Sequence, residues 1–155
     1  FEMEVAGFDQ VWDDYVAKQH GVRRYATVDG LAAAVDIITL HINLTDETRH
    51  LINRARLQKM RPGGVLLNTS RGELIDSAAV AEALQSGHLL GYGTDVLEEE
   101  PPPANHPLLG CPNALITPHI GSRTYESVAR QAKMAAENLI LVLTGKKPLA
   151  QANQT

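Results

Sequence analysis

The sequence has one cysteine, no long apolar run and no excess of basic residues. Cys111 stands alone, which excludes an internal disulfide and fits a reducing compartment such as the cytoplasm. No stretch stays apolar for the roughly 20 residues that a membrane helix needs, and no secretory signal opens the chain. Lys and Arg number 14 against 18 Asp and Glu, so a nucleic-acid surface is not indicated. We therefore expect small-molecule partners, with no nucleic acid and no membrane.

Metal-binding patterns are also missing. The six histidines fall into no His-Glu-x-x-His pattern, and the lone cysteine cannot form a Cys-x-x-Cys pair. We expect no metal site. At 155 residues and 44% hydrophobic content the chain suits one domain with a sizeable core and is too short for two full domains.

Short apolar runs alternate with helical patterns along the whole chain. Strands are predicted over residues 3–9, 22–25, 36–42, 65–67, 90–96 and 114–117. Helices are predicted over residues 12–19, 28–34, 54–59, 78–86 and 124–144, the last a long core helix. The predicted caps of the second, third and fourth helices are Thr27, Asn53 and Ser77. This alternation predicts an α/β fold, a doubly wound parallel sheet with helices on both faces.

Three chemically distinct side chains follow three of these strands. Arg71 comes after the run 65–67, which has the composition of a strand buried on both faces, while Glu100 and His119 follow the last two strands. An arginine can grip a carboxylate, a histidine can move a proton, and a carboxylate can hold that histidine charged. Taken singly, each also suits a surface loop, and we expect Glu98 and Glu99 to be solvated.

Asp9 ends the first predicted strand. An acid in that position of a dinucleotide-binding unit accepts hydrogen bonds from the adenosine ribose and repels a 2′-phosphate, which favours NAD. No Gly-x-Gly-x-x-Gly precedes it, so an aspartate in an ordinary turn is the alternative. Because the chain opens inside a strand, we expect it to be a fragment of a longer domain.

A family resemblance rests on five motifs that occur in the family's order and spacing between Phe1 and about Pro148. They are Leu51-Ile52-Asn53, Met60-Arg61-Pro62-Gly63-Gly64, Asn68-Thr69-Ser70-Arg71-Gly72, Asp95-Val96 with Glu99-Glu100-Pro101, and Thr117-Pro118-His119-Ile120-Gly121-Ser122. With them the sequence resembles the cofactor domain of the D-isomer-specific 2-hydroxyacid dehydrogenases. The resemblance implies a partial Rossmann-type sheet and, as catalytic residues, Arg71 for the substrate carboxylate and carbonyl, His119 as general acid and base, and Glu100 as its partner.

The resemblance also implies NAD as the cofactor. Asp9 matches the ribose-binding acid, and Asp95 matches the carboxylate that holds the nicotinamide carboxamide. The other residues expected to line the cofactor are Asn43, Leu44, Thr45, Thr69, Ser70, Arg71, His119, Ile120 and Gly121. Asn43 stands where many members have proline, which affects only the fine adenosine contact.

Parts of the family's architecture have no counterpart in this sequence. Residues 1–148 match the later part of the cofactor domain, with residues 149–155 as a tail, whereas the first strand, the glycine-rich phosphate loop and the substrate domain are absent. We expect the full-length parent to be a cytoplasmic, homodimeric NAD-dependent reductase of a small 2-keto acid, and the isolated fragment to be inactive. The alternative is a nucleotide-responsive, corepressor-like module, a branch of the same family that keeps the three catalytic residues.

Overall fold

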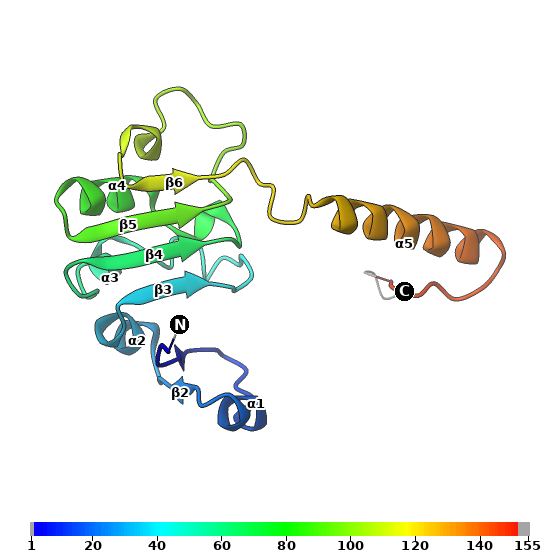
Figure 1. Ribbon diagram of the computed structural model, residues 1–155, viewed down its shortest axis with the longest axis horizontal. Coiled ribbons are helices and arrows are strands. Elements are labelled where there is room, and N and C mark those ends of the chain that lie inside the picture. Colours follow the sequence, from blue (N-terminus) through cyan, green and yellow to red (C-terminus); the bar gives the residue numbers. More distant parts are fainter. Residues whose placement is uncertain (1, 152–155) are drawn as a thin grey trace. The chain divides into compact units, whose positions relative to one another are not determined.

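The computed structural model describes residues 2–151 and divides the chain into two compact units (Figure 1). The first unit runs to Pro118 and the second begins at His119. The first contains β1 (Ala6–Gly7), α1 (Asp14–Gln19), β2 (Arg23–Arg24), α2 (Val28–Ala34), β3 (Ile37–Leu40), α3 (Arg54–Leu57), β4 (Gly64–Asn68), η1 (Gly72–Leu74), α4 (Ser77–Gln85), β5 (Leu89–Thr94), η2 (Pro107–Gly110) and β6 (Ala114–Ile116). The second contains α5 (Tyr125–Leu143).

All strand pairs are parallel, as predicted. One sheet has the order β3-β4-β5-β6, and a separate two-stranded sheet pairs β1 with β2. Short crossovers through α3, α4 and η2 connect the four strands in sequence, so their carboxyl ends lie along one edge (Figure 1). The predicted α/β sheet of the Rossmann type is confirmed.

The four-stranded sheet has a packed face and an open face. Ile38, Leu66 and Tyr92 lie in register on the packed face, and none is more than 7% exposed. The alternate register row on the open face holds Leu67, Gly93 and Leu115, of which Leu67 is 37% and Leu115 72% exposed. The prediction that residues 65–67 are buried on both faces is therefore wrong at Leu67, because successive side chains of a strand point to opposite faces and only one face is covered here.

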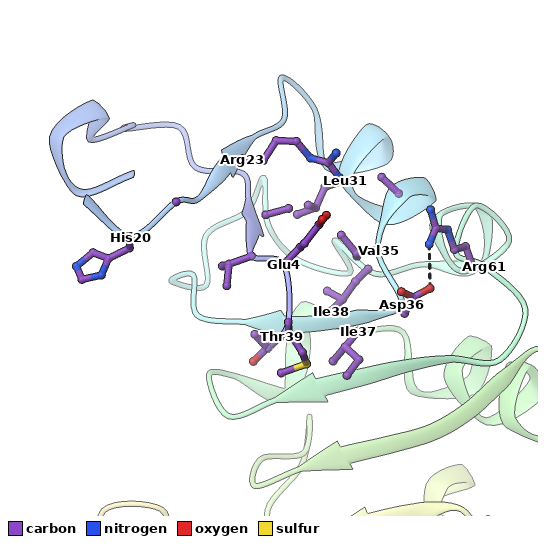
Figure 2. Close-up of a pocket in the computed structure, with 15 residues that line it drawn as sticks. Glu4, His20, Arg23, Leu31, Val35, Asp36, Ile37, Ile38, Thr39 and Arg61 are labelled. Carbon is purple, nitrogen blue, oxygen red and sulfur yellow. Dashed lines mark hydrogen bonds and ion pairs between the residues drawn. The ribbon is translucent and has the colours of Figure 1, made fainter. Parts of the chain in front are cut away.

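A cavity of about 1040 Å³ separates the two sheets (Figure 2). Residues 3–6 line one side and residues 34–39, which include the start of β3, line the other. Regular strand pairing in β1 is limited to Ala6–Gly7, shorter than the predicted 3–9, and Met3 and Val5 are 62% and 53% exposed. The reason is that β1 pairs with β2 on one side while its other side faces the cavity.

Polar side chains cap the amino-terminal ends of α2, α3 and α4. Thr27 accepts a hydrogen bond from Gly30 N at the start of α2, and Asn53 accepts one from Arg56 N at the start of α3, as predicted. For α4 the capping side chain is Asp76, which accepts from Ala79 N, whereas the predicted cap Ser77 is the first helical residue and is buried. Aspartate and serine can both cap a helix, so the local sequence does not decide between these two neighbours, and the predicted cap is wrong by one residue.

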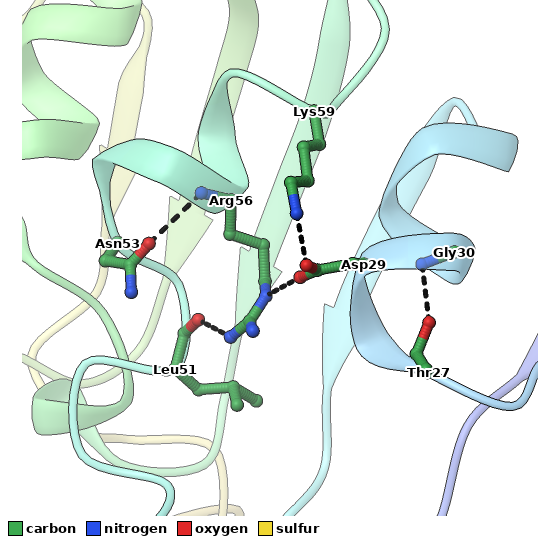
Figure 3. A network of polar contacts seen from close by, with 7 residues as sticks. All are labelled: Thr27, Asp29, Gly30, Leu51, Asn53, Arg56 and Lys59. Carbon is green, nitrogen blue, oxygen red and sulfur yellow. Dashed lines mark hydrogen bonds and ion pairs between the residues drawn. The ribbon is translucent and has the colours of Figure 1, made fainter.

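An ion-pair network joins α2 to the α3 region (Figure 3). Asp29 accepts from Arg56 Nε at 2.7 Å and also pairs with Lys59. The Arg56 guanidinium bonds the Leu51 carbonyl as well. The hydrogen bond from Lys59, followed by that from Arg56, lowers the pKa of the Asp29 carboxyl below its usual range.

The last helix differs from its prediction. α5 begins after the cap Thr124 and has the expected amphipathic pattern, yet it contains no buried residue, and Leu139 and Val142 are 60% and 56% exposed. It is therefore not a core helix in this chain, because an apolar stripe predicts a face to be covered without specifying what covers it. Within residues 2–151, no helix has the length and apolar character to cross a membrane.

Candidate active site at the carboxyl edge of the sheet

A buried asparagine shapes the turn that carries Arg71. Asn68 ends β4 with no exposed surface, its Nδ2 donates to Arg71 O at 2.9 Å, and its Oδ1 accepts from Ser70 N at 3.1 Å. Ser70 Oγ donates to Ile42 O at 3.1 Å, which ties the turn to the exit of β3. Arg71 itself is exposed, with Nη1 donating to Ser70 O at 2.7 Å. The backbone around the arginine is therefore anchored while its guanidinium remains at the surface.

The same turn packs tightly against the chain that follows β5. A Cβ placed on Gly72 would lie 2.0 Å from the Leu97 carbonyl carbon and 2.3 Å from the Glu98 nitrogen. Backbone therefore contacts backbone at this point, and only glycine fits without a shift. Gly72 thereby sets the distance between the turn of Arg71 and the acidic loop of residues 97–100.

Asp95 begins the exit of β5 and is only 9% exposed. Its Oδ1 accepts from Thr117 Oγ1 at 2.6 Å, and its N–H donates to Asn68 O at 3.1 Å. Thr94 Oγ1 donates to Asn68 O at 2.9 Å, so the exits of β4, β5 and β6 share one hydrogen-bond network. A carboxylate fixed in this way can receive an amide donor without reorganising.

Tyr92 lies in the same buried layer and is 2% exposed. Burial raises the pKa of its phenol. The phenol is therefore neutral at physiological pH, and it serves the core rather than proton transfer.

The acidic loop contains Glu98 and Glu100 in different roles. Glu100 Oε1 accepts from Leu97 N at 2.9 Å, which closes the loop on itself. Glu98 Oε1 lies 2.9 Å from His50 Nε2, and its side chain is 30% exposed. Glu98 and Glu99 are both exposed, as predicted, but Glu98 also contacts His50, 48 residues earlier in the chain.

The remaining predicted cofactor residues lie in loops after β1, β3 and β4. Asp9 is exposed, and its Oδ1 accepts from Val11 N at 2.9 Å, as in a local turn.

In the loop after β3, Asn43 is also exposed, and its carbonyl accepts from Thr48 Oγ1 at 2.9 Å, while Thr45 N donates to the same hydroxyl at 2.7 Å. These contacts order the loop after β3. Thr69 is exposed beside Arg71, and Leu44 is half-buried.

His119 is the first residue of the second unit. It has the left-handed backbone angle φ of 51°, and it is exposed, as are Ile120 and Gly121. Ile120 O accepts from Arg123 N at 2.9 Å, which forms a turn before α5. The pairing of His119 with Glu100 stays a prediction.

Two site residues carried no assigned role in the sequence analysis. Asn68 and Thr117 build the network, and the signal for Asn68 was a polar residue closing an apolar strand. Nothing local indicated the partnership of His50 with Glu98. Among residues 2–151 no group of three or more His, Cys, Asp or Glu side chains could hold a metal ion.

Comparison with known proteins decides the family. The family model described as the NAD-binding domain of D-isomer-specific 2-hydroxyacid dehydrogenases matches residues 1–121. The chain belongs to this family. A glyoxylate reductase of Thermofilum pendens is 45% identical over 130 residues, which cover 84% of this chain and 38% of that protein. A glyoxylate/hydroxypyruvate reductase B of Serratia proteamaculans is 46% identical over 129 residues, covering 83% and 40%.

A solved structure has the same fold over almost the whole chain. The TT0316 protein of Thermus thermophilus superimposes with a TM-score of 0.89 at 41% identity, covering 97% of this chain and 46% of that one. The chain thus spans less than half the length of these relatives. Its matched part is the NAD-binding domain of a 2-hydroxyacid dehydrogenase.

Proposed function

We propose that the full-length protein transfers a hydride between NAD(H) and a small D-2-hydroxy or 2-keto acid. The observation that carries this proposal is the anchored turn of Arg71 beside the buried Asp95–Thr117 pair at the carboxyl edge of the sheet. Glyoxylate or hydroxypyruvate is the proposed keto acid, since the curated relatives are reductases of these compounds. A phosphoglycerate dehydrogenase-like substrate is the alternative within the same chemistry.

Each catalytic residue has a distinct proposed role. Arg71 presents a guanidinium that matches a carboxylate in a two-pronged contact and offsets the substrate's charge. His119 donates a proton to the keto oxygen during reduction and takes it back during oxidation. Glu100 favours the protonated form of that histidine.

The hydrogen-bonding groups at this edge of the sheet fit a dinucleotide. Asp9 offers carboxylate oxygens at a strand exit, as ribose hydroxyls require, and Asp95 offers a buried carboxylate suited to a carboxamide. The other residues proposed to hold the cofactor are Asn43, Leu44, Thr45, Thr69, Ser70, Arg71, His119, Ile120 and Gly121. When bound, NADH supplies the hydride for the carbonyl carbon.

The cavity between the two sheets supports the proposal that residues 1–148 are the later part of the cofactor domain. In dinucleotide-binding sheets of order 3-2-1-4-5-6, the first strand lies between the second and the fourth. Here β2-β1 match strands 3-2 and β3-β4-β5 match strands 4-5-6, with β6 as an additional strand at the edge, and the cavity lies between β1 and β3. We propose that a strand with a glycine-rich loop fills this position in the full-length protein, and that this fragment alone is inactive.

The assembly and location are also proposals. A cytoplasmic homodimer joined through this domain fits the buried single thiol and the exposed apolar residues of α5, Leu139, Ile140 and Leu143. Light scattering of the full-length protein at working concentration should give the mass of a dimer, and a monomer would contradict this.

The test is turnover by the full-length protein. We expect NADH oxidation with glyoxylate or hydroxypyruvate, and a weaker rate with NADPH. His119→Ala should lower kcat by about 100-fold or more, since a general acid contributes that much. Arg71→Lys should chiefly raise KM for the keto acid, because the charge remains while the planar fork is lost. Lys18→Ala, at an exposed residue of α1, is the control.

Absence of turnover with any keto acid, together with NAD(H)-dependent binding of a protein partner, would instead establish the corepressor-like alternative. Equal catalytic efficiency with NADH and NADPH would overturn the role of Asp9. These two outcomes are separable, since the first concerns the reaction and the second only the ribose contact.

A further inference from the structure

One side-chain bridge connects two loops that leave different strands. His50 lies in the loop between β3 and α3, and Glu98 lies in the acidic loop after β5, with Nε2 and Oε1 2.9 Å apart. Their side chains are 49% and 30% exposed. β4 separates these strands in the sheet, so the bridge spans the exit that carries Arg71.

The backbone of His50 is held in an unusual conformation. Its φ is 50°, in the left-handed region that glycine favours, although histidine is one of the side chains tolerated there. His50 N donates to Glu73 O at 2.8 Å, and Ile52 N donates to Leu74 O at 3.0 Å, so this segment runs beside the turn that follows Arg71. A strained residue that the surrounding hydrogen bonds hold in place is typical of a functional position.

The Glu98 end is equally constrained. The Leu97–Glu98 peptide packs directly on Gly72, which follows Arg71, and Leu97 N donates to Glu100 Oε1 at 2.9 Å. A short path therefore leads from His50 through Glu98 and the loop backbone to Glu100. Glu98 and Glu100 therefore belong to one loop that the Leu97–Glu100 hydrogen bond closes.

We propose that His50 and Glu98 are positioning residues that hold the acidic loop against the turn of Arg71. This rests on the proposed function, in which Glu100 and Arg71 must keep a fixed spacing around one substrate. The bridge requires only that one ring nitrogen of His50 donates to the carboxylate, so neutral and protonated imidazole both serve. An ordinary exposed ion pair would instead have little effect on either loop.

The variants remove the bridge from each end in the full-length protein. His50→Gly deletes the side chain and suits the positive φ, so the fold should persist. Glu98→Ala deletes the acceptor, whereas Glu98→Gln keeps a carbonyl oxygen for the same hydrogen bond. Glu99→Ala, at an exposed neighbouring carboxylate, is the matched control.

We expect His50→Gly and Glu98→Ala each to lower kcat with the keto acid by about ten-fold or more, since small misplacements of catalytic groups are costly. KM for NADH should change little. The double variant should be no worse than the poorer single variant, since both break one contact. Glu98→Gln should retain most activity, and Glu99→Ala should match the unchanged protein.

Unchanged kcat in both single variants, or multiplicative losses in the double variant, would overturn the proposal. Hydrogen exchange of the backbone amides over residues 95–100 gives a reading that does not need turnover. If the unchanged protein reduces no keto acid, the proposed function fails, and the bridge is judged by exchange alone. Faster exchange in both single variants would then support the proposal that the bridge holds the acidic loop in place, and unaltered exchange would refute it.

Discussion

The packed and open faces of the four-stranded sheet arise from the same strands and have opposite characters. On the packed face Leu66 and Tyr92 are almost fully buried, whereas the open face pairs the partly exposed Leu67 with Gly93. Side chains on the packed face should therefore contribute most of the sheet's share of the folding free energy. The open side contributes little to this chain, although its apolar side chains are suited to burial by another element.

The largest expected difference in the free energy of unfolding is between variants of two glycines. Gly72→Ala would place a Cβ inside the Leu97 backbone, so we expect a loss of about 3 kcal/mol or more in the free energy of unfolding. Gly93→Ala meets only the Cδ2 end of Leu67, at 2.9 Å, and that side chain can rotate into open space. It should change stability by less than about 1 kcal/mol. Denaturant unfolding measures both, and equal losses would remove the distinction between packed and open regions.

Two neighbouring leucines sharpen the same comparison. Leu66→Ala empties a fully buried position, and we expect a cost of about 2–5 kcal/mol. Leu67→Ala removes a side chain that is 37% exposed, so its cost should stay below about 1 kcal/mol. If the second variant proved as costly as the first, the open face would have to be covered in solution.

A third prediction tests the link between the packed face and the site. Asn68→Ala leaves the Arg71 carbonyl and the Ser70 N–H without their partners, which should cost about 1–3 kcal/mol. In the full-length protein it should also raise KM for the keto acid through Arg71. Asn113→Ala removes a more exposed amide, which donates to Leu90 O at 3.1 Å, and serves as the control with a smaller loss.

The smallest effect is expected at the ion-pair network and depends on pH. Because the folded-state pKa of Asp29 lies below its ordinary value of 3.8, its stabilising contribution is present above that value and is lost as the pH falls through the folded-state pKa. Asp29→Asn should therefore be less stable at neutral pH, with the difference shrinking below about pH 4. Thermal unfolding against pH tests this, with Glu47→Gln, at an exposed loop carboxyl, as the control.

Sequence patterns predicted local features well and distant contacts poorly. The caps Thr27 and Asn53 and the position of Arg71 after its strand follow from neighbouring residues. The contact of His50 with Glu98 joins residues 48 apart, and no local rule selects that pair. The same limit explains α5, whose periodicity indicates an apolar face while its partner surface depends on tertiary structure.

Gly72 shows a different limit. A single glycine in a turn gives no local sign of a close contact, and the contact of Gly72 with Leu97 depends on how β4 and β5 align. The spacing of Arg71 from the acidic loop is thus a property of sheet register. A family resemblance can supply such a residue's role, but composition and periodicity cannot.

Cys111 is 6% exposed at the end of η2, and its Sγ donates to Pro107 O at 3.5 Å. The thiol is thus shielded from reagents in solution while the fold is closed. Because it is the only thiol in these 155 residues, the rate at which a maleimide or a disulfide dye labels this chain reports how often the region around Cys111 opens. The stability variants of this chain, at Gly72, Gly93, Leu66, Leu67 and Asp29, can all be compared by this labelling rate.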